Sequence, residues 1–357
     1  MLAGTAAAAL LVLGAPTHLY GLTRVKCPSG VPHAPSGCAQ LVGVDFSSGV
    51  ISNIGKGHSQ LAAVGDLRTV ANGIYYVLAD NCGGPCNATG TVLLGLSLAD
   101  GSVTCKADVP SLAEVGLVGG GQSLSHDAAN NRLLLTGPNS TDGGASYTHF
   151  VLSAPADASS GSCGPFTKLG EFGDANYEPM AHGSELDAAG QRLFITLSTG
   201  ARTYGMGVVD VRKGHPVNLT ATFPMGGRSS EYMWGPSFVR ATGRLVGAAS
   251  DVSGGIDWRT LDPASGAWTS AALKYAPGVK ARFPGLEGNL GSVRAYDAAA
   301  GLLYLLAGRG DPGAPTLEVV QIDVATGTLV GHSGPLTGDT GISGSVLSQL
   351  SLDPSAP

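Results

Sequence analysis

Apolar residues along this chain recur in pairs of short runs, separated by a turn of small and polar residues. In most copies an Asp ends the first run, and the second run begins six residues later. Four copies read SLSHDAANNRLLLTG, SELDAAGQRLFITLS, PSFVRATGRLVGAAS and VRAYDAAAGLLYLLA, with second runs at Leu133, Leu193, Leu245 and Leu303. An earlier copy, VANGIYYVLAD, begins its second run at Ile74. The intervals of 59, 60, 52 and 58 residues predict a repeat protein.

A second element follows each of these copies. It is an alternating apolar run that ends in Asp, then a turn with Gly, then another strand, as in LVGVDFSSGVIS and VVQIDVATGTLV. Asp and Gly at fixed offsets between alternating runs indicate a hairpin. Two linked hairpins make a unit of four strands. Six second elements can be counted, at Asp45, Asp100, about Ser153, Asp210, Asp262 and Asp323.

The first element of the sixth unit is split between the two ends of the chain. SQLSLDPSAP (Ser348 to Pro357) reads as its first strand, and THLYGLTRVKC (Thr17 to Cys27) reads as its second. Pairing of the two ends within one unit closes a ring of sheets. The sequence therefore predicts an all-β, six-bladed β-propeller closed by the C-terminal strand, with seven blades as the alternative. An open solenoid would not split one repeat between the two ends, and two β-sandwiches do not predict a repeat period of about 57 residues.

The predicted organisation is a signal peptide over residues 1–16 and a single propeller domain over 17–357. The predicted blades occupy 344–357 with 17–54, 57–108, 119–172, 181–225, 233–275 and 288–335. The repeat, best seen in DAAAGLLYLLAG followed by VVQIDVATGTLV, resembles the YVTN-type and quinoprotein-amine-dehydrogenase-like propellers. That resemblance implies the fold over most of the chain and little about chemistry.

Composition and charge agree with a folded, turn-rich β protein. Of 357 residues, 43% are hydrophobic, 13% are charged and 55 are Gly. The net charge of −6 gives no reason to expect nucleic acid as a partner. Ala6 to Leu13 is an apolar run of signal-peptide length, which predicts secretion, with a buried first strand as the alternative. The sequence predicts no membrane span.

The cysteines and glycosylation triplets also favour the secretory pathway. The six cysteines are Cys27, Cys38, Cys82, Cys86, Cys105 and Cys163, and three N-x-[ST] triplets begin at Asn87, Asn139 and Asn218. We expect a disulfide-bonded glycoprotein. Local pairing of Cys27 with Cys38 and of Cys82 with Cys86 leaves Cys105 with Cys163, one of 15 arrangements. The alternative interpretation is a zinc site, but the Cys pair in CGGPC has no second Cys or His pair at metal-binding spacing.

The segments that lead into the first strands should surround one mouth of the central channel, where loops on a rigid scaffold bind ligands. The candidate ligand-binding residues there are Gln122, Glu178, His182, Glu231, Trp234, Glu287 and Asn289. Glu178, Glu231, Glu287 and Asn289 supply oxygen atoms that could hold Ca²⁺, the one cofactor suggested. The alternative is that the Glu residues are solvated and the aromatic residues pack between blades.

Residues that recur with the repeat are better explained by structure. Asp127, Asp187, Asp297 and Asp353 occupy the same place in each copy, which indicates turn capping. His126 and His182 are expected to pack rather than to act as bases.

These features favour a secreted or extracellular binding module for a protein or glycan. The alternative is a Ca²⁺-dependent hydrolase or lactonase at the channel mouth. No catalytic residue can be assigned, because the usual motifs for hydrolysis and phosphate binding are missing from the sequence.

Overall fold

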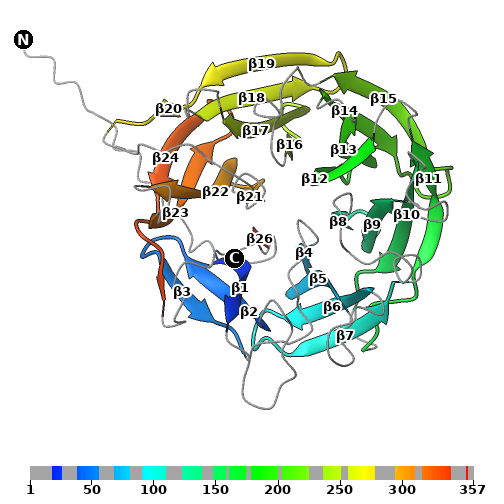
Figure 1. Ribbon diagram of the computed structural model, residues 1–357, viewed down its shortest axis with the longest axis horizontal. Coiled ribbons are helices and arrows are strands. Elements are labelled where there is room, and N and C mark those ends of the chain that lie inside the picture. Colours follow the sequence, from blue (N-terminus) through cyan, green and yellow to red (C-terminus); the bar gives the residue numbers. More distant parts are fainter. Residues whose placement is uncertain are drawn as a thin grey trace, which may run out of the picture.

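The computed structural model describes residues 18–25, 38–55, 68–80, 91–109, 123–138, 148–157, 161–173, 178–199, 203–224, 236–250, 256–277, 294–309, 316–338 and 351–352. Every regular element in these ranges is a β-strand. The strands form six sheets, which are arranged in a ring around a central channel (Figure 1). The prediction of a six-bladed β-propeller is confirmed.

The strands of each blade follow one another from the channel outward, except for β25 and β26 in blade one and β20 in blade six. Blade one contains β26 (Ser351–Leu352), β1 (His18–Val25), β2 (Cys38–Asp45), β3 (Val50–Asn53) and, at its outer edge, β25 (Thr337–Gly338). Blade two contains β4 (Arg68–Ala71), β5 (Ile74–Asp80), β6 (Thr91–Ser97) and β7 (Val103–Asp108). Blade three contains β8 (Ser123–Asp127), β9 (Arg132–Pro138), β10 (Thr148–Pro155) and β11 (Thr167–Gly173).

The other three blades repeat this order. Blade four contains β12 (Glu178–Asp187), β13 (Arg192–Thr199), β14 (Thr203–Asp210) and β15 (Asn218–Pro224). Blade five contains β16 (Ser237–Val239), β17 (Arg244–Ser250), β18 (Ile256–Asp262) and β19 (Ala267–Ala272). Blade six contains β21 (Arg294–Asp297), β22 (Leu302–Arg309), β23 (Thr316–Asp323), β24 (Thr328–His332) and, at its outer edge, β20 (Lys274–Tyr275).

Blade one closes the ring in the way the split repeat predicts. The C-terminal strand β26 is its innermost strand and pairs antiparallel with β1, where Leu19 lies opposite Leu352 and Tyr20 opposite Ser351. A second contact comes from β25, which pairs parallel with the outer strand β3. The chain from blade six therefore reaches both edges of blade one.

The hydrophobic core is divided into six clusters, one at each seam between neighbouring blades. One repeat position supplies a fully buried side chain to every seam, and its members are Leu19, Tyr75, Leu133, Leu193, Leu245 and Leu303. The sequence alignment of the earlier copy at Ile74 is thus wrong by one residue. Asn72 and Gly73 make a two-residue turn with positive φ at both positions, which shifts the register of that hairpin.

The glycine that ends the turn of the second element allows the preceding blade to come close. Gly101 in blade two has a φ of +69°, and a Cβ there would lie 2.3 Å from the carbonyl oxygen of Ile54 in blade one. A substitution therefore has to move backbone, because no flexible side chain separates the two blades at this point.

Gly101→Ala should lower the free energy of unfolding by about 3 kcal/mol, of which about 1 kcal/mol is the cost of a positive φ. The matched control is Gly301→Ala, because Gly301 has a φ of +68° and open space around the added methyl group. Denaturant unfolding of both variants measures the difference. Equal losses would show that close approach of the blades does not matter at Gly101.

Candidate functional site

The predicted ligand residues at the channel mouth can be placed only in part. Glu178 and His182 lie on the inner strand β12 of blade four, and their side chains are outside the described part of the structure. Five other candidates, Gln122, Glu231, Trp234, Glu287 and Asn289, lie outside the described residues altogether. Their role in binding remains a prediction. By sequence they precede the inner strands β8, β16 and β21.

Inside the channel, charged side chains from separate blades are joined by hydrogen bonds. Arg294 on β21 donates through Nη2 to the carbonyl oxygen of Pro236 at 2.6 Å, and its Nε lies 3.3 Å from Ser237 Oγ on β16. The same Nη2 lies 3.4 Å from Glu185 Oε2 on β12. Arg68 on β4 donates to the carbonyl oxygen of Arg294 at 3.3 Å. We call Arg68, Glu185, Ser237 and Arg294 the channel cluster.

The channel cluster follows from the geometry of the innermost strands. Such a strand pairs on one side only, so some of its carbonyl groups face the channel without a ladder partner. Arg294 and Arg68 each donate to one of these carbonyl groups, on blades five and six. The cluster links blades two, four, five and six, whose inner strands β4, β12, β16 and β21 surround the channel (Figure 1).

Glu185 is the only acidic member of the channel cluster. Burial raises the pKa of Glu185, while the charge of Arg294 and a backbone hydrogen bond from Phe238 act in the opposite direction. The side chain nevertheless keeps 25% of its surface accessible, against 10% for Arg294. The cluster therefore has a carboxyl group that its neighbours hold in place, on a side chain that is only partly buried.

Sequence reasoning missed the channel cluster because its members are not repeated at one position with one residue type. The lead-in segments are distinguished by Glu and aromatic residues. In GLEGNLGSVRAYD that pattern points to Glu287 and Asn289 and not to Arg294. A usable signal was present. Arg68 and Arg294 both begin inner strands, and basic residues are rare in a chain with 20 Lys and Arg among 357 residues.

His126 lies on the inner strand β8 and is half-buried. Its Nε2 is buried and has no hydrogen-bond partner in the described part of the chain. Burial lowers the pKa of His126, with Asp127 acting in the opposite direction. A base needs a group that orients it and a route for the proton. Among the described residues no group hydrogen bonds to Nε2, so packing is the better description of His126.

The recurring Asp residues serve the turns, as predicted, in two of the four copies. Asp187 accepts from the backbone N–H of Gly190, and Asp297 accepts from those of Ala299 and Ala300. Asp353 lies outside the described residues. Asp127 differs, because its carboxylate accepts hydrogen bonds from the side chains of Asn130, Arg132 and Gln191.

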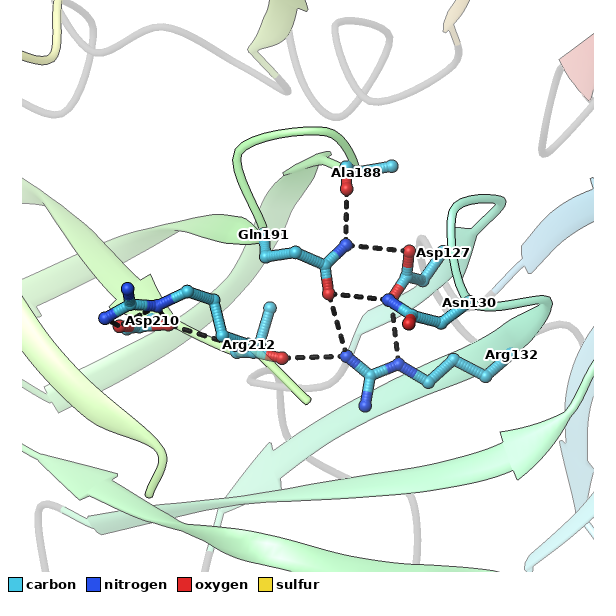
Figure 2. Close-up of polar contacts among 8 residues, drawn as sticks. Asp127, Asn130, Arg132, Ala188, Gln191, Asp210 and Arg212 are labelled. Carbon is cyan, nitrogen blue, oxygen red and sulfur yellow. Dashed lines mark hydrogen bonds and ion pairs between the residues drawn. The ribbon is translucent and has the colours of Figure 1, made fainter. Parts of the chain in front are cut away.

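Asp127 is fully buried at the centre of a polar network between blades three and four, which we call the seam network (Figure 2). Arg132 donates to Asp127 at 2.7 Å, Asn130 at 2.8 Å and Gln191 at 2.9 Å. Gln191 belongs to blade four and accepts in turn from Asn130 at 2.8 Å and Arg132 at 3.1 Å. A final bond runs from Arg132 to the carbonyl oxygen of Val211 at 2.7 Å.

The seam network decides the charge state of Asp127. Burial alone would raise the pKa of this carboxyl, but the hydrogen bonds from Arg132, Asn130 and Gln191 and the charge of Arg132 outweigh burial and lower it. Both oxygens of the carboxylate accept hydrogen bonds within the protein, and the bonds of Gln191 to Asp127, Asn130 and Arg132 join blade four to blade three.

The described cysteines confirm one predicted disulfide. Cys105 on β7 is bonded to Cys163, which precedes β11, so the bridge ties blade two to blade three. The pairing of the other four cysteines remains a prediction.

Within the described ranges no three His, Cys, Asp or Glu side chains are grouped in a way that could hold a metal ion. The predicted Ca²⁺ ligands have side chains outside those ranges. No helix in the described ranges has the length and apolar character to cross a membrane.

Comparison with known proteins adds no family. No protein-family model and no curated protein matches the chain. Among solved structures, a putative TolB from Agrobacterium tumefaciens has a TM-score of 0.49 and 9% identity, covering 90% of this chain and 89% of that one. TolB from Acinetobacter baumannii has a TM-score of 0.48 and 8% identity, covering 86% of this chain. This chain spans 62% of that TolB.

A third structure is a putative 6-phosphogluconolactonase from Bacteroides uniformis, with a TM-score of 0.44 and 12% identity. The match covers 90% of this chain and 84% of the lactonase chain. At these identities the likeness concerns the fold, and we infer no activity from it. The chain is a β-propeller protein, defined by its six sheets and their closure.

Proposed function

We propose that this chain is a secreted or extracellular binding module whose ligand, a protein or a glycan, docks at the mouth of the central channel. The observation that carries the proposal is the channel cluster, which gives a rigid ring a polar and charged interior. A preorganised scaffold of this kind lowers the entropy cost of binding. Apart from Gln122, which precedes β8, the predicted mouth residues precede or belong to inner strands that carry this cluster.

The proposed compartment has two supporting observations. The disulfide Cys105–Cys163 joins segments of two blades and needs an oxidising environment to persist. Asn218, the first residue of a glycosylation triplet, is exposed at the start of the outer strand β15. Both features suit a protein that folds in the secretory pathway. The triplets at Asn87 and Asn139 lie outside the described residues.

The thermal unfolding temperature tests the proposed function. The secreted protein is unfolded with a panel of oligosaccharides and short acidic or basic peptides, and with 1 mM CaCl₂ or EDTA. A ligand at about 100 times its dissociation constant stabilises the folded state by about 2.7 kcal/mol, which appears as a higher Tm. We expect at least one organic probe to raise the Tm in the presence of EDTA.

Two variants locate the ligand. Trp234→Ala at the proposed mouth should abolish the rise in Tm. Lys213→Ala, in the exposed turn between β14 and β15 at the opposite end of the strands, should leave it unchanged. A rise with CaCl₂ that Glu287→Ala removes would instead support the Ca²⁺-dependent hydrolase. A Tm that none of the probes changes would count against both functions.

A further inference from the structure

The outer strand of each blade presents backbone N–H and C=O groups that are not paired within the blade. Uncovered edges of this kind invite pairing with another strand. Two blades receive a short strand from the preceding blade. β20 pairs parallel with β24, placing Lys274 opposite Thr328, and β25 pairs parallel with β3, placing Thr337 opposite Val50. The ring therefore already uses strand addition at its outer edges.

Three further outer strands are protected in other ways. β7 is held by the disulfide Cys105–Cys163, and the N–H of Lys106 donates to the carbonyl oxygen of Gly161 at 3.4 Å. β11 carries an ion pair of Lys168 and Glu171, and its pairing with β10 contains a bulge. β15 ends in Pro224 and also has a bulge in its pairing. Charges, Pro and bulges are the usual means of blocking an edge.

β19 of blade five has none of these protections. Its sequence AWTSAA contains no charged residue and no Pro, and its six residues pair with β18 without a bulge. Five of the six side chains are exposed, and the sixth, Trp268, is held by a bond from its Nε1 to the carbonyl oxygen of Pro224 at 3.0 Å. Among the described strands none pairs with the outer edge of β19, which lies on the rim of the ring (Figure 1).

We propose that the outer edge of β19 is the site at which two copies of this chain pair, antiparallel, about a two-fold axis. Closed two-fold dimers use the same patch on both copies, so the patch must be complementary to itself. A register that pairs all six residues sets Thr269 opposite Ser270 of the second copy, and Ala267 opposite Ala272. No like charges meet in this register, and the opposed side chains are small apart from Trp268.

The charges that flank β19 favour the same arrangement. Asp262 lies at the turn before β19, where Ala264 and Ser265 hydrogen bond to its carboxyl and lower its pKa. Lys274 lies beyond the other end of β19 and is exposed. Antiparallel pairing therefore brings the Lys274 end of one copy to the Asp262 end of the other, twice by symmetry. These opposite charges set the direction of pairing.

Sedimentation equilibrium of the full chain tests the proposal. A six-residue strand edge is a small interface, so we expect a monomer–dimer equilibrium visible over about 1–300 µM. Thr269→Lys places an ammonium group on the edge of each copy and should weaken the dimer at least about tenfold. Val103→Lys, at an exposed position of the protected strand β7, is the matched control and should sediment as the wild type does.

Circular dichroism and thermal unfolding establish that all three proteins are folded. A wild type that stays monomeric throughout the concentration range overturns the proposal. A dimer that Thr269→Lys leaves intact overturns it as well, because it places the interface elsewhere on the molecule. A dimer that Thr269→Lys weakens while Val103→Lys does not supports pairing through β19. The proposal does not depend on the proposed binding function, since the rim and the channel mouth are separate surfaces.

Discussion

Asp127→Asn should lower the free energy of unfolding by about 3–5 kcal/mol, because it leaves Arg132 as a buried charge without its anion. Asp127 is fully buried and the Arg132 side chain keeps 9% of its surface accessible. The amide can still accept one bond from Gln191 or Arg132, but its own N–H₂ would point at donors. Denaturant unfolding at pH 7 measures the loss.

Asp187→Asn is the matched control for this experiment. Asp187 occupies the same repeat position in blade four and pairs with Arg192 at 2.7 Å, but the Arg192 side chain is 39% exposed. Water can solvate that guanidinium after the substitution, so the expected loss is about 1 kcal/mol. If the two variants lose equal stability, burial of the seam network is not what makes Asp127 important.

His149→Phe should remove much of the acid sensitivity of the fold. His149 on β10 is fully buried, and none of the described residues hydrogen bonds to either of its ring nitrogens. Its ring packs against Phe172 at 5.5 Å between centroids. Burial lowers the pKa of His149 to about 3, whereas an unfolded histidine has a pKa of about 6.5. A phenyl ring fits the same apolar surroundings and binds no proton.

The sign of the pH effect follows from proton binding. Between about pH 6.5 and 3 the unfolded state binds a proton at His149 and the folded state does not, so stability falls as the pH falls. Each pH unit in that window costs about 1.4 kcal/mol, which gives about 2 kcal/mol at pH 5. His126 also makes the fold less stable at acid pH, because burial lowers its pKa. This contribution to the pH dependence remains in His149→Phe.

Urea unfolding of the wild type and His149→Phe at pH 7.5 and pH 5 measures this effect. The stability difference between the two proteins should grow by about 2 kcal/mol at the lower pH. His215→Gln is the control, because His215 is exposed in the turn before β15. A difference that stays constant with pH would mean that the imidazole of His149 is protonated in the folded protein as well.

The fold could be predicted from the sequence because its signals are repeated. Six similar hairpin patterns average out local errors, and the split repeat at the two ends of the chain specifies closure through β26 and β1. The register of blade two was missed because Asn72 and Gly73 form a shorter turn than the other copies. Such a slip changes which face each residue occupies, and only the packing of Tyr75 reveals it.

The channel cluster could not be predicted in the same way. Its bonds join residues on four blades, and a partner such as the carbonyl oxygen of Pro236 has no sequence signature. The seam network has the same character, since Gln191 binds Asp127 across a blade boundary. A repeat reveals what every blade shares, whereas these clusters depend on the residues that differ between blades.

The pairing of β26 with β1 has a consequence for synthesis of the protein. Blades two to six are each made of strands that follow one another in the chain, so each can assemble soon after its own residues leave the ribosome. Blade one cannot, because β1 must wait for a partner made at the far end of the chain. Until then the ring is open, and the apolar flank of blade one that packs against blade six is uncovered. A chaperone that acts on this protein during translation is therefore expected to hold the segment around β1 longest.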